Sequence, residues 1–97
     1  MPTYLVLANF TDQGIRNIKE TTKRAQNFRE MAKKLGIVLK DIHWLLGQYD
    51  FMTIAEAPDE GAMTALGLSV GALGNVRTVT QRAFSSDEIT KVLARMV

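Results

Sequence analysis

The side chains best suited to chemistry lie in one short stretch of this chain. His43 and Trp44 come shortly before Tyr49 and Asp50. His43 is the single histidine and could act as a general base, with Asp50 orienting it or a substrate hydroxyl. The alternative is structural, because an aspartate beside a turn often accepts hydrogen bonds from the turn's own amides. We therefore take His43 and Asp50 as the candidate catalytic residues and keep the structural alternative open.

A second group of side chains could bind a ligand without reacting with it. Arg82 could hold a carboxylate or phosphate, or form a salt bridge between subunits. Tyr49 could donate its phenol to a ligand or close one mouth of a cavity with its ring. The candidate ligand-binding residues are Tyr4, Trp44, Tyr49, Arg82 and Asn9. For Trp44, a place in the core or in an interface is the competing interpretation.

Several kinds of site have no support in the sequence. The chain contains no cysteine, which excludes disulfides, thiol nucleophiles and cysteine-ligated metals. One histidine and unclustered carboxylates do not predict a metal site. The glycines at 71 and 74 end a predicted helix, whereas nucleotide-binding glycines precede one. We predict no metal and no cofactor, and the sequence leaves open whether the protein is an enzyme.

Composition predicts one folded domain over residues 1–97. Hydrophobic residues make up 46% and charged residues 23%, a balance typical of globular proteins. No apolar run is long enough for a membrane span, and the first ten residues lack a basic leader, so a cytoplasmic location is expected. The net charge of +2 gives a weak field, so nucleic acid is an unlikely partner. We interpret the basic residues between 16 and 34 as the solvated face of a helix.

The periodicity of the chain predicts the element order βαββαβ. Strands are expected at residues 3–10, 38–46, 49–57 and 75–84, with a tight two-residue turn at 47–48. One helix should run from a Thr11 cap to Gly36, with a weak point near residues 21–22, and another from Asp59 to about Leu73. Ser85 and Glu88 have capping-box spacing, which predicts a short C-terminal helix. The order predicts an α+β, ferredoxin-like fold with an extra C-terminal helix.

The predicted strand order has consequences for the site. We expect the first and third strands to lie in the middle of the sheet, parallel to each other. That arrangement gathers one group at one end of the sheet: His43, Trp44, Tyr49, Asp50, Tyr4 and Arg82. The opposite end should gather Asn9, Glu56, Asn75 and Arg77.

The two central strands are apolar on both faces, whereas the helices can cover only one face. Leaving the other face in water would cost on the order of 10 kcal/mol, comparable to the stability of a small domain. The simplest cover is the same face of a second copy. We therefore expect a homodimer, or a larger homo-oligomer, that encloses a cleft between two sheets.

Several blocks of the sequence resemble one protein family. They are residues 1–4 with 9–16, Gly47-Gln48-Tyr49-Asp50, residues 56–59, and residues 74–84. These blocks are similar to those of the GYD-domain proteins, small prokaryotic proteins of the dimeric α/β-barrel class. The resemblance spans nearly the whole chain and implies a ferredoxin-like dimer. It implies no activity, because the family is functionally uncharacterised.

Three functions remain open at this point. The first is binding or conversion of a small organic molecule, aromatic ones included, in the cleft of the homodimer. This hypothesis rests on analogy with barrels of the same class. The second is a structural or regulatory assembly module without pocket chemistry. The third is RNA binding, because the RNA-recognition motif shares the topology and residues 49–54 faintly resemble its central strand. Asp50 would place a negative charge beside the bases, which disfavours RNA. We rank small-molecule binding first.

Overall fold

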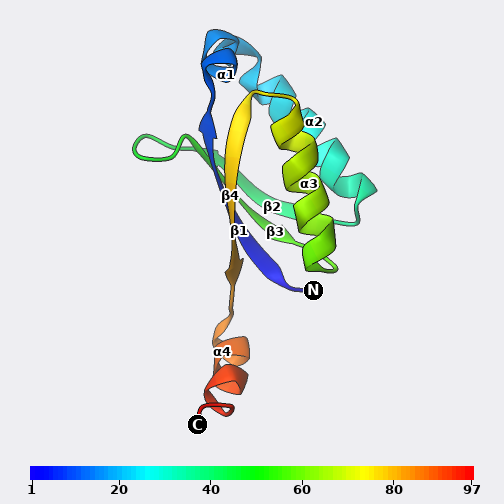
Figure 1. Cartoon of the computed structure of the whole chain (residues 1–97), viewed down its shortest axis with the longest axis vertical. Helices are drawn as coiled ribbons and strands as arrows, with labels where there is room; N and C mark the ends of the chain where they lie inside the picture. The colour runs from blue at the N-terminus through cyan, green and yellow to red at the C-terminus, as the bar shows by residue number, and fades with distance from the viewer.

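The computed structural model describes residues 1–97 as a four-stranded sheet with helices packed on one face (Figure 1). The spatial strand order is β2-β3-β1-β4. The strands are β1(Thr3–Phe10), β2(Val38–Trp44), β3(Phe51–Glu56) and β4(Val76–Ala83). The helices are α1(Asp12–Arg16), a 3-10 turn η1(Ile18–Glu20), α2(Thr21–Lys34), α3(Glu60–Ala72) and α4(Ser86–Leu93). None of the helices has both the length and the apolar character that a membrane crossing requires.

The sheet is antiparallel throughout, so the predicted parallel pairing of the first and third strands is wrong. In β1, Val6 lies opposite Thr53 of β3 and Thr80 of β4, and both pairings are antiparallel. The reason lies in the connections. A helix joins β1 to β2, which leaves these two strands parallel, and β3 returns between them after a hairpin. The α+β, ferredoxin-like βαββαβ fold with its added C-terminal helix is confirmed.

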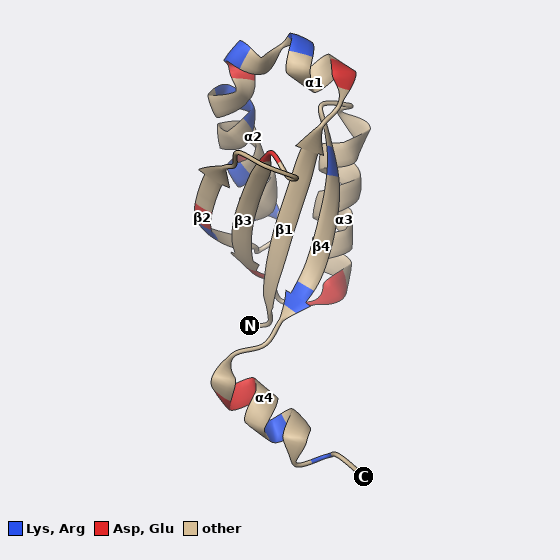
Figure 2. Cartoon of the chain, turned by 90° about the vertical axis from the view of Figure 1, so that its left-hand side faces the viewer, with Lys and Arg blue, Asp and Glu red and all other residues tan.

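The hydrophobic core lies between the sheet and the helices α2 and α3. Tyr4, Val6 and Ala8 alternate along β1 and are all buried, as period-two spacing requires. Phe28 of α2 and Leu66 of α3 pack over the same sheet face. The opposite face has no helix over it, as Figure 2 shows. Leu5 and Leu7 of β1 project from that uncovered face.

The first helical segment is broken where the sequence predicted weakness. Thr11 caps α1 and accepts a hydrogen bond from the Gly14 amide. The helix then stops at Arg16, and α2 restarts at Thr21 after a 3-10 turn. A Cβ on Gly14 would lie 2.0 Å from the carbonyl oxygen of Asn75, so only glycine allows α1 to approach the α3–β4 turn this closely. This contact fixes the corner from which α2 begins.

The connection between β2 and β3 is longer than the predicted two-residue turn. β2 ends at Trp44 and β3 begins at Phe51, which leaves a loop over residues 45–50. The Leu45 amide donates to the Asp50 carbonyl, while the Asp50 amide donates to Ala8 of β1. The main chain of Asp50 is therefore bonded both to Leu45, just after β2, and to Ala8 of β1.

Helix α4 stands apart from the rest of the molecule (Figure 1). It follows β4 after a short link and points away from the sheet and the other helices. The predicted capping box is confirmed, because Ser85 and Glu88 exchange both side-chain to main-chain hydrogen bonds. Ile89, Val92 and Leu93 form an apolar stripe on α4 that remains exposed. The protomer leaves this stripe without a packing partner.

Candidate functional site

The structure separates the residues that the sequence analysis grouped at one end of the sheet. Because Phe51 lies opposite Ala8, the β2–β3 loop sits beside the end of β1 and the start of β4. The residues at this end are His43, Trp44, Tyr49, Asp50, Asn9, Asn75 and Arg77. Tyr4 and Arg82 lie opposite each other at the far end, with Glu56. The predicted grouping is wrong because it assumed parallel central strands.

The candidate residues also lie on different faces of the sheet. His43 is opposite Met52 and faces the uncovered side, as does the exposed Asn9. Trp44 is opposite Phe51 and faces the helices, and so do Tyr4 and Arg82. No single cavity can therefore contain all of these side chains. His43 is exposed, and no hydrogen bond joins it to Asp50.

Asp50 has a structural position in this protein. Its carboxylate oxygen Oδ2 accepts a 2.9 Å hydrogen bond from the Phe10 amide. Its own amide donates to the Ala8 carbonyl at 2.9 Å. These contacts attach the β2–β3 loop to the end of β1. The role is structural, but the donor is the Phe10 amide and not an amide of the turn, as the sequence analysis had considered.

Trp44 connects the edge strand β2 to the start of α2. Its indole Nε1 donates a 2.9 Å hydrogen bond to the Thr21 hydroxyl. Its ring meets Phe51 edge-on, with the ring centroids 5.7 Å apart. The single tryptophan is thus fixed beside Phe51. Its fluorescence should therefore respond to changes in the space that Phe51 lines.

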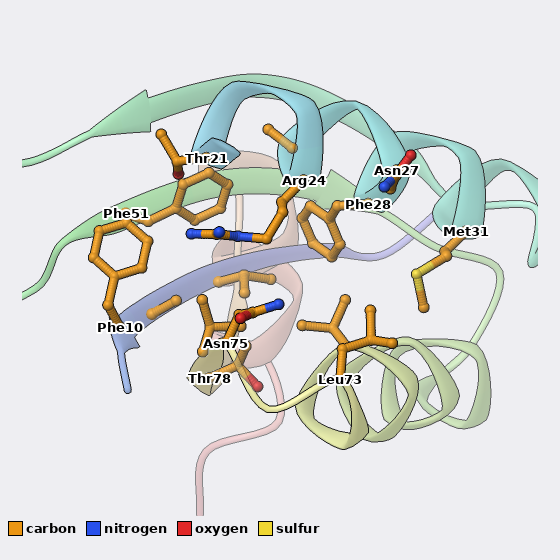
Figure 3. Close-up of a pocket in the computed structure, with 15 residues that line it drawn as sticks. Phe10, Thr21, Arg24, Asn27, Phe28, Met31, Phe51, Leu73, Asn75 and Thr78 are labelled. Carbon is orange, nitrogen blue, oxygen red and sulfur yellow. The ribbon is translucent and has the colours of Figure 1, made fainter. Parts of the chain in front are cut away.

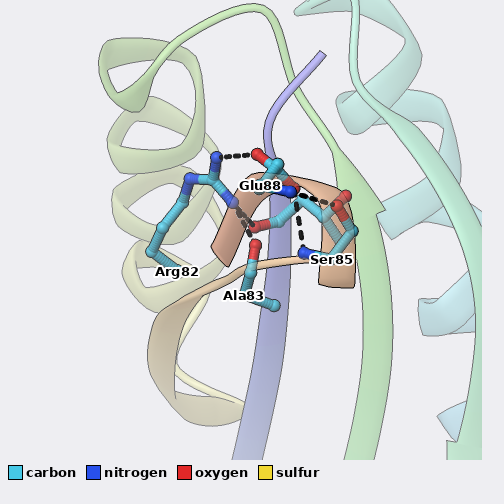
Figure 4. Close-up of polar contacts among 5 residues, drawn as sticks. Arg82, Ala83, Ser85 and Glu88 are labelled. Carbon is cyan, nitrogen blue, oxygen red and sulfur yellow. Dashed lines mark hydrogen bonds and ion pairs between the residues drawn. The ribbon is translucent and has the colours of Figure 1, made fainter. Parts of the chain in front are cut away.

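Arg82 is engaged by its own chain (Figure 4). The guanidinium forms a 2.6 Å ion pair with Glu88 and donates to the carbonyls of Ala83 and Thr3. It also lies over the Phe84 ring, 4.5 Å from the centroid. The hydrogen bond from Arg82, together with the Ser85 amide, lowers the pKa of Glu88 to about 2. Arg82 therefore anchors α4 to β4.

The concave site that the structure does contain lies on the helix side of the sheet, between α2 and α3 (Figure 3). It is a half-open cavity of about 230 Å³. Ten of its fifteen lining residues are hydrophobic, and three of these are phenylalanines. The principal wall residues are Val6, Ala8, Phe10, Phe28, Phe51, Val70, Leu73 and Val76. The sequence analysis missed this cavity. The sequence did contain a signal for the cavity. Ala8 of β1 and Ala25 of α2 are small residues on faces that also carry phenylalanine.

Few polar groups reach this cavity, and Arg24 is the only charged one among them. Its guanidinium points across the space between Phe51 and Asn75 (Figure 3). Nη1 donates to the Asn17 carbonyl at 2.7 Å and Nη2 to the Gly14 carbonyl at 3.2 Å. No carboxylate pairs with Arg24.

The uncovered sheet face is the second notable surface. Its centre is apolar and is formed by Leu5, Leu7, Met52, Ile54 and Val79. At one margin Lys40 forms a 2.5 Å ion pair with Glu56, which raises the pKa of Lys40 and lowers the pKa of Glu56. A bulge between Leu39 and Asp41 interrupts the edge strand there. Nowhere do three or more His, Cys, Asp or Glu side chains gather as a metal-binding cluster.

The fold and these surfaces define a small α+β protein with an uncovered sheet face and an apolar cavity on the helix side. Comparison with known families identifies it further. The model of the GYD domain matches residues 4–93, so the chain belongs to the GYD domain family. The resemblance noted from the sequence is confirmed.

A curated protein matches this chain over nearly the full length of both sequences. It is a protein of Thermus thermophilus named glutamine synthetase and cystathionine beta-lyase binding protein. The two sequences are 28% identical over 97 residues, which cover 99% of this chain and 99% of the relative.

Proposed function

We propose that this protein is a homodimeric module that binds another protein, with no catalytic step of its own. The observation that carries the proposal is the apolar surface that the protomer leaves uncovered, on the sheet face and on α4. The dispersed positions of His43, Asp50 and Arg82 also support a binding role, because Asp50 and Arg82 are committed to main-chain and ion-pair contacts. This reverses the order in which the sequence analysis ranked its first two hypotheses.

The uncovered sheet face is the proposed dimer interface. Leu5, Leu7 and Val79 lie side by side across β1 and β4 and would be removed from water by a second copy. A two-fold axis along the strands would set the β2 edge of one copy over the β4 edge of the other and cover the apolar centre of both sheets.

The dimer is tested by a charge placed in the centre of that face. Leu7→Lys should convert the dimer into a protomer of 10.8 kDa, measured by sedimentation equilibrium at micromolar concentration. Leu68→Lys is the matched control, because Leu68 is an exposed leucine on α3, and it should stay dimeric. A wild-type protein that sediments as a protomer contradicts the proposed interface.

Helix α4 is the proposed surface for the protein partner. Its apolar stripe is exposed in the protomer, and amphipathic helices bind well in apolar grooves of other proteins. The capping box and the Arg82–Glu88 ion pair hold the helix in one orientation. The name of the Thermus relative suggests an enzyme of nitrogen or sulfur amino-acid metabolism as the partner class, which is consistent with a cytoplasmic location.

Partner binding is tested with purified glutamine synthetase and cystathionine β-lyase encoded in the same genome as this chain. Calorimetric titration should detect a complex with at least one of them. Val92→Lys, in the apolar stripe, should weaken it at least tenfold, whereas Thr90→Lys, beside the stripe, should change it little. Equal binding by both variants removes α4 from the interface, and no complex with either enzyme contradicts the proposed partner class.

A second candidate function is the binding of a small organic molecule. The observation that favours it is the apolar cavity on the helix side. We therefore move the ligand proposed from the sequence out of the dimer cleft and into this cavity. His43 and Asn9, which face the other side of the sheet, have no part in that site.

A further inference from the structure

We propose that the cavity between α2, α3 and the sheet binds a small aromatic carboxylate, with Arg24 as its anion-binding residue. The inference rests on the second candidate function, small-molecule binding. It specifies the ligand's chemical class and the residue that selects it. It is independent of the proposed dimer interface and of α4, which lie on other surfaces.

The volume and lining of the cavity determine how large the apolar part of the ligand can be and favour an aromatic ring. An apolar cavity of about 150 Å³ accommodates benzene. The 230 Å³ here therefore has room for one ring and a short side chain. Phe10, Phe28 and Phe51 form walls on three elements (Figure 3), and the Phe28 and Phe51 rings already meet edge-on with centroids 6.1 Å apart. A third ring can join such a cluster in offset or edge-to-face geometry.

The polar groups of the cavity set the charge of the ligand. Arg24 donates hydrogen bonds from two of its N–H groups to the carbonyls of Gly14 and Asn17. A guanidinium has five N–H groups, so three remain for a ligand. No protein carboxylate neutralises it, although it is partly buried beside apolar walls. A partly desolvated cation in that position favours an anionic partner, and carboxylates are well matched to guanidinium.

Asn75 supplies a second donor, from the wall of the cavity that faces Arg24. Its side-chain oxygen accepts a 3.0 Å hydrogen bond from Gln13, which fixes the orientation of the amide. The Asn75 NH₂ group then has no hydrogen-bond partner within the chain. Arg24 and Asn75 are both labelled around the space in Figure 3, where their polar ends approach the cavity from opposite walls. We place the ligand's carboxylate between these two donors, in a cavity whose lining is mostly hydrophobic.

The inference predicts a preference for charge between ligands of equal shape. We would titrate the full chain by calorimetry with 3-phenylpropionate and with 3-phenylpropan-1-ol, which has the same ring and chain length but no charge. The acid should bind at least tenfold more tightly. Trp44 contacts both Phe51 and Thr21, which line the cavity, so its fluorescence should change with the same midpoint as the heat signal. Equal affinities, or no binding of the acid at millimolar concentration, overturn the proposal.

Variants then locate the site. Arg24→Gln keeps an amide that can still donate to a main-chain carbonyl, and it should remove the preference for the acid. Arg29→Gln is the matched control, because Arg29 is exposed on the same helix and does not line the cavity. An unchanged preference in Arg24→Gln, or the same loss in both variants, contradicts the role of Arg24.

A cavity-filling variant covers the case in which Arg24→Gln fails to fold. Ala25→Phe places a ring into the lining of the cavity and leaves Arg24 in place. It should weaken both probes at least tenfold, and undiminished binding in this variant means that the probes bind elsewhere. Failure of these titrations leaves the enzyme complex measurable through Val92→Lys, so the ligand proposal and the protein-binding proposal fail separately.

Discussion

Replacing Asp50 by alanine tests whether this residue has a structural role. The change removes the carboxylate that accepts the Phe10 amide at 2.9 Å and leaves the main-chain bonds of residue 50 available. A hydrogen bond to a charged group contributes about 1.5–3 kcal/mol to stability. Water can partly replace the acceptor, because the site is only part-buried. We therefore expect Asp50→Ala to lower the free energy of unfolding by about 1.5–2.5 kcal/mol.

The assay is urea denaturation followed by Trp44 fluorescence, at one fixed protein concentration because dimer stability depends on it. In a thermal melt the same loss corresponds to about 6–20 °C for a chain of this size. Asp50→Asn keeps an oxygen acceptor without the charge, so it should lose only about 0.5–1 kcal/mol.

Asp87→Ala serves as the control, since Asp87 is exposed on α4, away from the sheet, and accepts no hydrogen bond. It should stay within about 0.5 kcal/mol of the wild type. If Asp50→Ala changes stability no more than Asp87→Ala does, the structural assignment of Asp50 is refuted and its catalytic role regains support.

Three further predictions concern packing and pH. Gly14→Ala should destabilise the protein by about 2–4 kcal/mol in thermal unfolding, because the new methyl group would displace the Asn75 carbonyl; an unchanged melting temperature contradicts that contact. Thr53→Val should stabilise it by about 1 kcal/mol, because the buried Thr53 hydroxyl has no hydrogen-bond partner; a loss of stability would show that the hydroxyl is satisfied. The folded pKa of Glu88, about 2, lies below its usual 4.5, so its anchoring of α4 is complete above pH 4.5 and is lost as the pH falls toward 2. The Ser85 amide resonance should follow that titration, and a midpoint near pH 4.5 contradicts the ion pair.

Much of the fold could be predicted from the sequence because local signals agreed with the tertiary structure. The alternation of Tyr4, Val6 and Ala8 identified the buried face of β1, and Thr11, Asp59 and Ser85 all cap helices as predicted. The prediction of strand direction failed because residue types carry no information about the direction of a strand. It follows from where the connections cross the sheet, and one wrong direction moved Tyr4 and Arg82 to the wrong end.

The candidate site was harder to predict because it depends on contacts between distant residues. The Asp50 carboxylate bonds to Phe10, forty positions away, and nothing local to residues 47–50 indicates that acceptor. Arg24 looked like one more charge on a solvated helix, whereas its side chain turns toward the cavity. Only the relative placement of α2 and α3 distinguishes Arg24 from the exposed Arg29.

The outlying position of α4 affects how the size of the particle must be measured. The Cα radius of gyration is 14.6 Å, whereas a compact chain of 97 residues has about 12.5 Å. The protomer is 50 Å long and 19 Å thick, so it diffuses more slowly than a sphere of its mass. On a sizing column calibrated with round standards, a lone copy elutes early and mimics a pair. Mass from equilibrium sedimentation or static light scattering is independent of shape and avoids this error.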